Sequence, residues 1–139
     1  MSVALWPATL GYWMDTLMQP VFKPAAIEQT LKSSGLSPED GDALVRLGGM
    51  KMGVDGGFEG GFMREPYEEP YGEGGKFRGL QTTPPDRFNE SVKLYNRLGW
   101  RVYTHAVGDA AIDEVLTAYE AADAEKSIAG RRWMCGCPC

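Results

Sequence analysis

The chain has 139 residues, of which 43% are hydrophobic and 24% charged, and its formal net charge at pH 7 is −5. These values are typical of one globular domain with a buried core, and they exclude a disordered chain. The acidic balance also excludes nucleic acid as a predicted partner, because phosphate binding needs a basic surface and no run of lysine and arginine is present.

Residues 1–22 are rich in apolar side chains but do not form a uniform apolar segment. Pro7, Gly11 and Asp15 interrupt the stretch, and no basic residue precedes Lys23. Signal peptides begin with a basic region, and membrane helices need about 20 mostly apolar residues in a row. We therefore expect a cytoplasmic protein that makes no contact with a membrane.

Four elements are expected in the first part of the chain. Residues 2–8, SVALWPA, are predicted to form a short apolar strand that Pro7 ends. Residues 24–35 are predicted to form a helix, with proline at its start and glycine as its stop. Residues 36–49 are expected to form a helical turn or a short helix that leads into a loop. Residues 50–54, MKMGV, are typical of a buried parallel strand.

Residues 55–83 show neither a helical nor a strand period. Loops of this length are uncommon in compact domains unless they are functional or disordered. The aromatic side chains favour an ordered lid over a flexible linker: Phe58, Phe62, Tyr67, Tyr71 and Phe77. The charged residues of this loop suit a cover over a substrate, and a run of solvated charges is the alternative interpretation.

The second part of the chain is expected to alternate helix and strand. Residues 86–99 carry Phe88, Val92, Tyr95 and Leu98 at helical spacing, and a glycine follows as a stop. Residues 100–105 alternate as a strand does. Residues 110–123 are predicted to form a helix with Asp109 as its N-cap. The predicted apolar face of this last helix consists of Ile112, Val115, Leu116, Tyr119 and Ala122.

Strands that alternate with helices imply an α/β fold built from parallel βαβ units with right-handed crossovers. In such sheets the loops that leave the carboxyl ends of the strands form the active site. Two glycine-rich junctions fall at these positions, VDGG at residues 54–57 and HAVGD at residues 105–109. His105, the single histidine of the chain, is therefore predicted to lie where this fold class binds its ligands.

Two segments around these junctions together resemble one known family. KMGVDGGFEGG at residues 51–61 and YTHAVGDAAIDEVLTAYEAA at residues 103–122 resemble the metal-dependent hydrolases of amidohydrolase family 3, which include the N-substituted formamide deformylase-like enzymes. The first is similar to the family's K-hydrophobic-x-x-DG segment at the fourth barrel strand. The second is similar to its H-A-x-G-D segment at the fifth. The resemblance covers roughly residues 2–133 and assigns WPAT, at residues 6–9, to the third strand.

The fold that the resemblance implies is a (β/α)₈ barrel of about 250 residues. Residues 1–133 would supply a partial barrel, from the third strand to the helix after the fifth. The family's H-x-H pair, its sixth-strand histidine and its eighth-strand aspartate have no counterpart in the sequence. The sixth-strand I-E-H motif is expected soon after Trp133, where the chain instead reads Met134 and CGCPC. Residues 134–139 are therefore expected to be an aberrant cysteine-rich tail outside the fold, from a truncated or frame-shifted gene.

The resemblance implies roles for four residues near the two junctions. His105 would be a metal ligand, and Lys51 would be the lysine that the family can carry as a carbamate bridging two metals. Asp55 and Asp109 would lie in the second shell of the site and orient it, although Asp55 could instead be a turn residue and Asp109 only a helix cap. The implied cofactor is a divalent metal, expected to be zinc. The implied reaction is hydrolysis of a non-peptide C–N bond by metal-activated water.

The implied substrate is a small molecule with an amide-type or formamide-type bond. Because His105 and Lys51 supply at most two ligands, the isolated chain is expected to be inactive, and the missing barrel portion would be its partner. Two other classes stay open. One is a non-catalytic α/β module whose glycine-rich loop binds a partner or a small anion. The other is a thiol-rich metal or redox peptide defined by CGCPC at residues 135–139.

Overall fold

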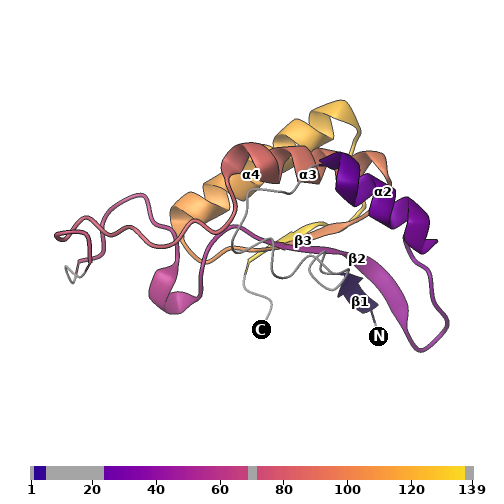
Figure 1. The fold of residues 1–139 in the computed structure, drawn as a ribbon, viewed down its shortest axis with the longest axis horizontal. Coiled ribbons are helices and arrows are strands. Elements are labelled where there is room, and N and C mark those ends of the chain that lie inside the picture. The colour runs from indigo at the N-terminus through magenta and orange to yellow at the C-terminus, as the bar shows by residue number, and fades with distance from the viewer. Residues whose placement is uncertain (1, 6–23, 69–71, 137–139) are drawn as a thin grey trace.

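The computed structural model describes residues 2–5, 24–68 and 72–136 (Figure 1). Strands and helices alternate along these segments, as the sequence predicted. In chain order the elements are β1 (Ser2–Leu5), α2 (Pro24–Ser34), β2 (Arg46–Gly53), the short 3₁₀ helix η2 (Phe58–Gly60), α3 (Pro85–Arg97), β3 (Val102–His105), α4 (Asp109–Glu125) and β4 (Met134–Cys135). Within this part of the chain, no helix is both long enough and apolar enough to cross a membrane.

The four strands form one parallel sheet in the order β1-β2-β3-β4. Each strand therefore pairs with the next strand along the sequence. Figure 1 shows α2, α3 and α4 on the same side of this sheet. A sheet with sequential parallel strands and all its helices on one face has the architecture of a sector of a (β/α)₈ barrel wall. The predicted α/β class and the partial barrel are confirmed.

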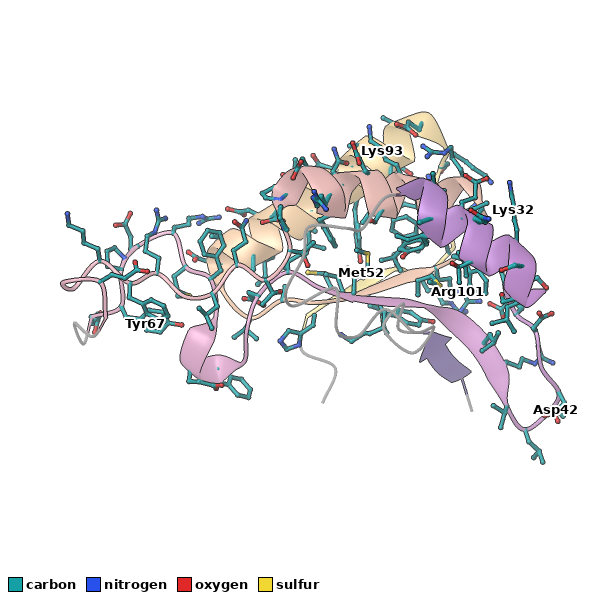
Figure 2. The ribbon with its side chains drawn as sticks, viewed as in Figure 1. Lys32, Asp42, Met52, Tyr67, Lys93 and Arg101 are labelled. Carbon is teal, nitrogen blue, oxygen red and sulfur yellow. The ribbon has the colours of Figure 1, made fainter. Side chains whose placement is uncertain are left out.

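The hydrophobic core lies between the sheet and the helices. Met50 of β2, Val102 of β3, Phe88 and Val92 of α3, and Val115 of α4 are all 0% exposed. Met52 is partly buried against this cluster, between β2 and the helices (Figure 2). The apolar spacing read from residues 86–99 therefore identified the buried face of α3 correctly.

The buried face of α4 differs in part from the prediction. Ile112 and Leu116 were expected in the core, yet they are 37% and 49% exposed. The helix instead buries a stripe rich in small side chains, which lets its backbone approach α3 and the sheet closely. This stripe consists of Ala111, Val115, Ala118, Tyr119 and Ala122.

The prediction of a helical turn or short helix within residues 36–49 is wrong. Asp40 accepts hydrogen bonds from the N–H and hydroxyl groups of Ser37, at 2.6 and 2.7 Å, and Asp42 accepts two from the N–H groups of residues 44 and 45. These side chains close tight turns in place of helical backbone bonds. As a result β2 begins at Arg46, earlier than the predicted start at residue 50.

Two further predictions concern the ends of the chain: a strand over residues 2–8 and a tail outside the fold from residue 134. The strand predicted over residues 2–8 is present at Ser2–Leu5, and the rest of it, with WPAT, lies outside the described residues. The expectation that the chain leaves the fold after residue 133 is wrong, because Met134 and Cys135 form β4 beside β3. Parallel pairing uses backbone groups, so this strand forms without the family's sixth-strand motif. Residues 137–139 lie outside the described residues.

Candidate functional site

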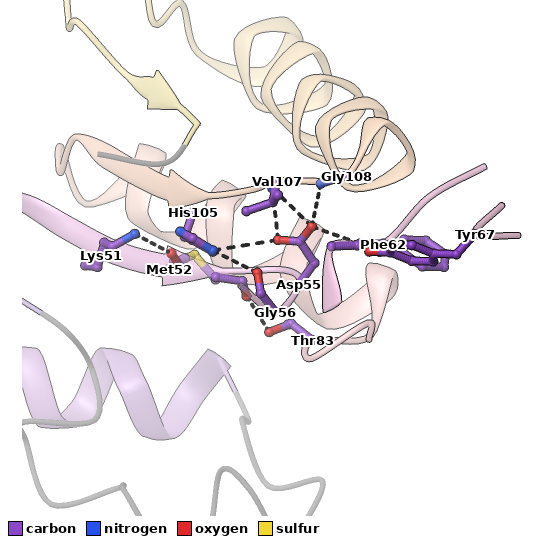
Figure 3. Close-up of polar contacts among 12 residues, drawn as sticks. Lys51, Met52, Asp55, Gly56, Phe62, Tyr67, Thr83, His105, Val107 and Gly108 are labelled. Carbon is purple, nitrogen blue, oxygen red and sulfur yellow. Dashed lines mark hydrogen bonds and ion pairs between the residues drawn. The ribbon is translucent and has the colours of Figure 1, made fainter. Parts of the chain in front are cut away.

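Lys51 and His105 lie on the same face of the sheet, near the carboxyl ends of neighbouring strands (Figure 3). In the parallel pairing of β2 and β3, Lys51 aligns with Tyr103 and Gly53 aligns with His105. Side chains alternate between the two faces along a strand. Thr104, between the two aligned β3 residues, is 2% exposed on the helix side. Lys51 and His105 therefore point away from the helices, to the face that lines the interior of a closed barrel.

His105 ends β3, and its side chain is 26% exposed. Its Nε2 atom lies 3.0 Å from the carbonyl oxygen of Gly56 and 4.0 Å from Oδ1 of Asp55. A carbonyl oxygen only accepts hydrogen bonds, so the neutral imidazole carries its proton on Nε2. Nδ1 then keeps a lone pair. A neutral ring held by an acceptor at one nitrogen has the form in which histidine binds a metal through the other.

Lys51 is partly buried on β2. Its Nζ donates a hydrogen bond to the carbonyl oxygen of Met52 at 3.3 Å (Figure 3). The side chain thus stays along the strand that carries it, on the face shared with His105. The predicted adjacency of residues 50–54 and 100–105 as parallel strands, with both side chains near one sheet edge, is confirmed.

Asp55 follows β2, and its carboxylate is fully buried. Oδ2 accepts hydrogen bonds from the N–H groups of Phe62, Val107 and Gly108, at 3.0, 3.0 and 2.8 Å. Oδ1 also accepts from the N–H group of Val107, at 3.1 Å. Three charge-assisted donors compensate the carboxylate for its lost water. Asp55 therefore joins the loop after β2 to the turn after β3 and lies beside the imidazole.

Asp109 is the first residue of α4, and Gly108 takes the N-cap position that the sequence assigned to Asp109. Asp109 Oδ1 accepts the N–H groups of Ala110 and Arg64, at 2.8 and 2.9 Å. The Arg64 N–H group is the main cause that lowers the pKa of this carboxyl. The Arg64 guanidinium also pairs with Asp113. The partners of Asp109 thus lie in the long loop and on α4, not at the imidazole.

The loop after β2 packs directly against the start of α4. A Cβ atom added at Gly108 would lie 1.8 Å from the carbonyl oxygen of Phe62, so only glycine fits there. Gly79 has a φ of +99°, and a Cβ atom added there would lie 2.0 Å from the carbonyl oxygen of Gly61. These contacts fix the path of the loop next to the site.

The described part of the long loop is packed. The rings of Tyr67 and Phe77 stack with centroids 5.7 Å apart, and the Tyr67 hydroxyl donates to the carbonyl oxygen of Gly61 at 2.7 Å. Thr83 donates to the carbonyl oxygen of Gly53 at 2.7 Å. These contacts agree with the predicted ordered loop. Residues 69–71, including Tyr71, lie outside the described residues.

The donors near His105 fit part of a metal site. Among the described residues, no group of three or more histidine, cysteine, aspartate and glutamate side chains could hold a metal ion. His105 offers one nitrogen, Lys51 would need conversion to a carbamate, and the carboxylate of Asp55 is occupied by backbone N–H groups. A catalytic zinc usually has three protein ligands. The described residues could therefore supply at most two ligands of such a centre.

Cys135 has a partly buried thiol on β4, the strand beside β3. Burial, with a smaller effect from the charge of Asp55, raises the pKa of this thiol. A raised pKa disfavours the thiolate that metal binding and redox chemistry need. Cys137 and Cys139 lie outside the described residues.

Sequence reasoning missed two groups at this site. The Gly56 carbonyl oxygen, which orients the imidazole, left no signal because any residue supplies such a group. Arg64 was grouped with the charged residues of the loop and not assigned a partner. Asp109 and Asp113 stand four residues apart on one helix face. This spacing indicates that one basic side chain could pair with both, but it does not identify that side chain as Arg64.

The fold and the position of the site define this chain as a sector of a (β/α)₈ barrel with its candidate ligands at the carboxyl ends of the strands. The family model described as "Amidohydrolase family" matches residues 16–137. The chain belongs to the amidohydrolase family.

Two solved structures are similar to the chain. An uncharacterized metal-dependent hydrolase from Pyrococcus furiosus is 25% identical and superposes with a TM-score of 0.61, over 86% of this chain and 21% of that chain. A second one, from Pyrococcus horikoshii OT3, is 22% identical with a TM-score of 0.59, over 85% of this chain and 20% of that chain, and this likeness concerns the fold alone. The chain thus spans about a fifth of the length of both structures. A search of curated proteins finds no match to the chain.

Proposed function

We propose that this chain supplies part of the metal site of a hydrolase that acts on non-peptide C–N bonds, with His105 as a metal ligand. Lys51 is the second ligand of the proposal, after conversion to a carbamate. The observation that carries the proposal is the position of both side chains on the helix-free face at the carboxyl ends of β2 and β3. The metal of the proposal is zinc, which imidazole nitrogen suits.

The chain's own residues have defined tasks in this proposal. The carbonyl oxygen of Gly56 accepts a hydrogen bond from the Nε2–H group of His105, so the lone pair of Nδ1 stays available to a cation. Lys51 can form a carbamate once its amine is neutral. When bound, the metal lowers the pKa of a water and polarises the scissile carbonyl group. The substrate of the proposal is a small amide-type or formamide-type molecule, and the proposed location is the cytoplasm.

The alternative of a small-anion site at HAVGD has less support. Such a site would use the N–H groups at the start of α4. Two of these groups, from Val107 and Gly108, already donate to the buried carboxylate of Asp55. A negative ligand would have to displace that carboxylate or lie beside its charge.

The proposal includes a partner for the sheet and helices of this chain. β1 and β4 are the outer strands of the described sheet, and Ile112, Leu116 and Met134 are exposed. In a closed barrel, further βα units cover such edges and side chains. The proposed partner is therefore another set of barrel units, in the same protein or in another chain.

A zinc titration followed by calorimetry tests the ligand assignment. We expect His105→Ala to abolish zinc binding, and Cys135→Ala and the distant control Ile112→Ala to preserve it. Binding that is lost only with Cys135→Ala would support the thiol hypothesis instead. Zinc binding that persists unchanged in His105→Ala would refute the metal role of His105.

Native mass spectrometry tests the role of Lys51. In bicarbonate buffer with zinc, we expect the mass of the chain to increase by one carbon dioxide. The increase should disappear in Lys51→Arg and persist in Lys93→Arg, a control on the outer side of α3. Unmodified Lys51 under saturating zinc would contradict the carbamate.

An activity assay tests the last part of the proposal, which is that these residues alone do not support turnover. With zinc supplied, the chain should hydrolyse formamide substrates no faster than background, because two ligands are too few for a catalytic zinc. Turnover that requires zinc and disappears with His105→Ala would show the opposite.

A further inference from the structure

We propose that Asp55 is a positioning residue that holds His105 in one tautomer and fixes the two loops around it. The inference concerns the same site as the proposed function. It rests on that proposal only for the role of His105 as a metal ligand. The geometry that carries it is the arrangement of the two carboxylate oxygens between backbone donors on one side and the imidazole on the other (Figure 3).

One oxygen of Asp55 acts as a clamp between distant segments. Oδ2 accepts three backbone N–H groups, one of them seven residues away at Phe62 and the others 52 and 53 residues away at Val107 and Gly108. The side chain is fully buried, so no water competes for these donors. The clamp joins the loop after β2 to the turn that follows His105.

The other oxygen faces the imidazole. Oδ1 has a single backbone donor, Val107 at 3.1 Å, and lies 4.0 Å from Nε2 of His105. The carbonyl of Gly56, the residue after Asp55, lies 3.0 Å from the same nitrogen. A negative charge and an acceptor dipole at one ring nitrogen both favour the tautomer with its proton there. Asp55 thus acts on His105 directly through its charge and indirectly by fixing the position of Gly56.

The clamp depends mainly on Oδ2, whereas Oδ1 is the oxygen that faces the imidazole. An asparagine at position 55 could place its amide oxygen at the Oδ2 position and keep the three donors of the clamp. Its NH₂ group would then replace Oδ1, facing the Val107 N–H group and Nε2 of His105 as a donor. Asp55→Asn therefore separates the clamp from the effect on the imidazole, whereas Asp55→Ala removes both.

Nitrogen-15 NMR of the metal-free chain, at a pH where the imidazole is neutral, reads the tautomer. His105 is the only histidine, so both ring-nitrogen signals come from one residue, and their couplings to the ring C–H protons distinguish Nδ1 from Nε2. We expect the Nε2–H form to dominate in the unmodified chain. In Asp55→Asn we expect a several-fold lower ratio of the Nε2–H form to the Nδ1–H form, with hydrogen-exchange protection of Gly108 largely kept. The control Asp113→Asn, an exposed carboxylate on α4, should leave the ratio unchanged.

Each outcome decides the inference. A tautomer ratio in Asp55→Asn equal to that of the unmodified chain would overturn it. If that variant does not fold, a dominant Nδ1–H form in the unmodified chain would overturn it, and a dominant Nε2–H form there with protected Val107 and Gly108 amides would support it. Zinc titration of Asp55→Asn adds a second readout, with an expected loss of about 10-fold or more in affinity. Zinc binding that persists unchanged in His105→Ala would refute the proposed function and leave the tautomer result standing.

Discussion

The two faces of the sheet are built from alternating residues of the same strands, yet they carry different properties. On the face that meets the helices, Met50 and Val102 are 0% exposed and Thr104 is 2% exposed. On the opposite face, Lys51 and His105 are only partly buried, and their polar atoms are held by backbone carbonyl groups. A step of one residue along a strand therefore separates the side chains that stabilise the fold from those that can carry chemistry.

The largest expected effect compares two adjacent residues of β2. Met50→Ala should lower the free energy of unfolding by about 2–5 kcal/mol, because it leaves a cavity in the core. Lys51→Ala should change it by about 0.5 kcal/mol or less, as substitutions away from the core do. Urea denaturation followed by circular dichroism measures both. Equal losses for the two variants would break the comparison.

The next comparison uses adjacent residues of β3. The hydroxyls of Thr104 and Tyr119 form a buried hydrogen bond of 2.8 Å. Thr104→Val should cost about 1 kcal/mol of unfolding free energy, the usual contribution of such a bond, and should leave zinc affinity unchanged. His105→Ala should abolish zinc binding. Calorimetric titration beside denaturation separates the two faces, and a loss of zinc binding in Thr104→Val would contradict the separation.

The next prediction concerns Glu114 of α4 and the pH dependence of the free energy of unfolding. Burial raises the pKa of Glu114 above its usual value of 4.5, although a hydrogen bond from Gln81 opposes this shift. The folded state then binds the proton more tightly than the unfolded state, so the stability from this group is present below pH 4.5 and lost as the pH rises through the folded-state pKa. Glu114→Gln should therefore gain stability relative to the unmodified chain as the pH rises from 4 to about 7. Denaturation at several pH values measures the difference. A gain that is independent of pH would contradict the role of this group.

A smaller, local effect is expected where the long loop meets α4. Arg64 pairs with Asp109 and Asp113, and all three side chains are about half exposed. Arg64→Ala should leave the melting temperature nearly unchanged, because exposed ion pairs contribute little to stability. It should speed hydrogen exchange at the amide of residue 64, which donates to Asp109. Lys76→Ala, in the same loop, is the control. A global loss of stability would show that the loop belongs to the core.

The smallest effect on stability is expected at the exposed apolar pair of α4. Replacing Ile112 and Leu116 by serine should change the unfolding free energy by about 0.5 kcal/mol or less, in contrast to Val115→Ala beside them. The double variant should also reduce self-association, since it removes an apolar surface. Analytical ultracentrifugation measures this. Strong destabilisation would show that these side chains pack in the fold after all.

Much of the fold followed from local patterns in the sequence. The helix-spaced residues of α3, the alternation before His105 and the glycines at the strand ends predicted parallel βαβ units. The same patterns placed Lys51 and His105 near one sheet edge. Prediction failed where local and tertiary preferences differ. Ile112 has the apolarity of a core residue, but its position on α4 turns it away from the sheet, and the packing of the alanine stripe decides that rotation.

The sequence by itself determined the order of the elements, the α/β class and the place of the single histidine at the end of a strand. These properties depend on residues a few positions apart, where spacing and turn chemistry act. Only the tertiary structure decided which groups hold the imidazole. The Gly56 carbonyl lies 49 residues from His105 in the chain, and Asp55 reaches donors 52 and 53 residues away. Backbone groups of this kind are the same in every residue, so only folding brings them into contact with one particular side chain.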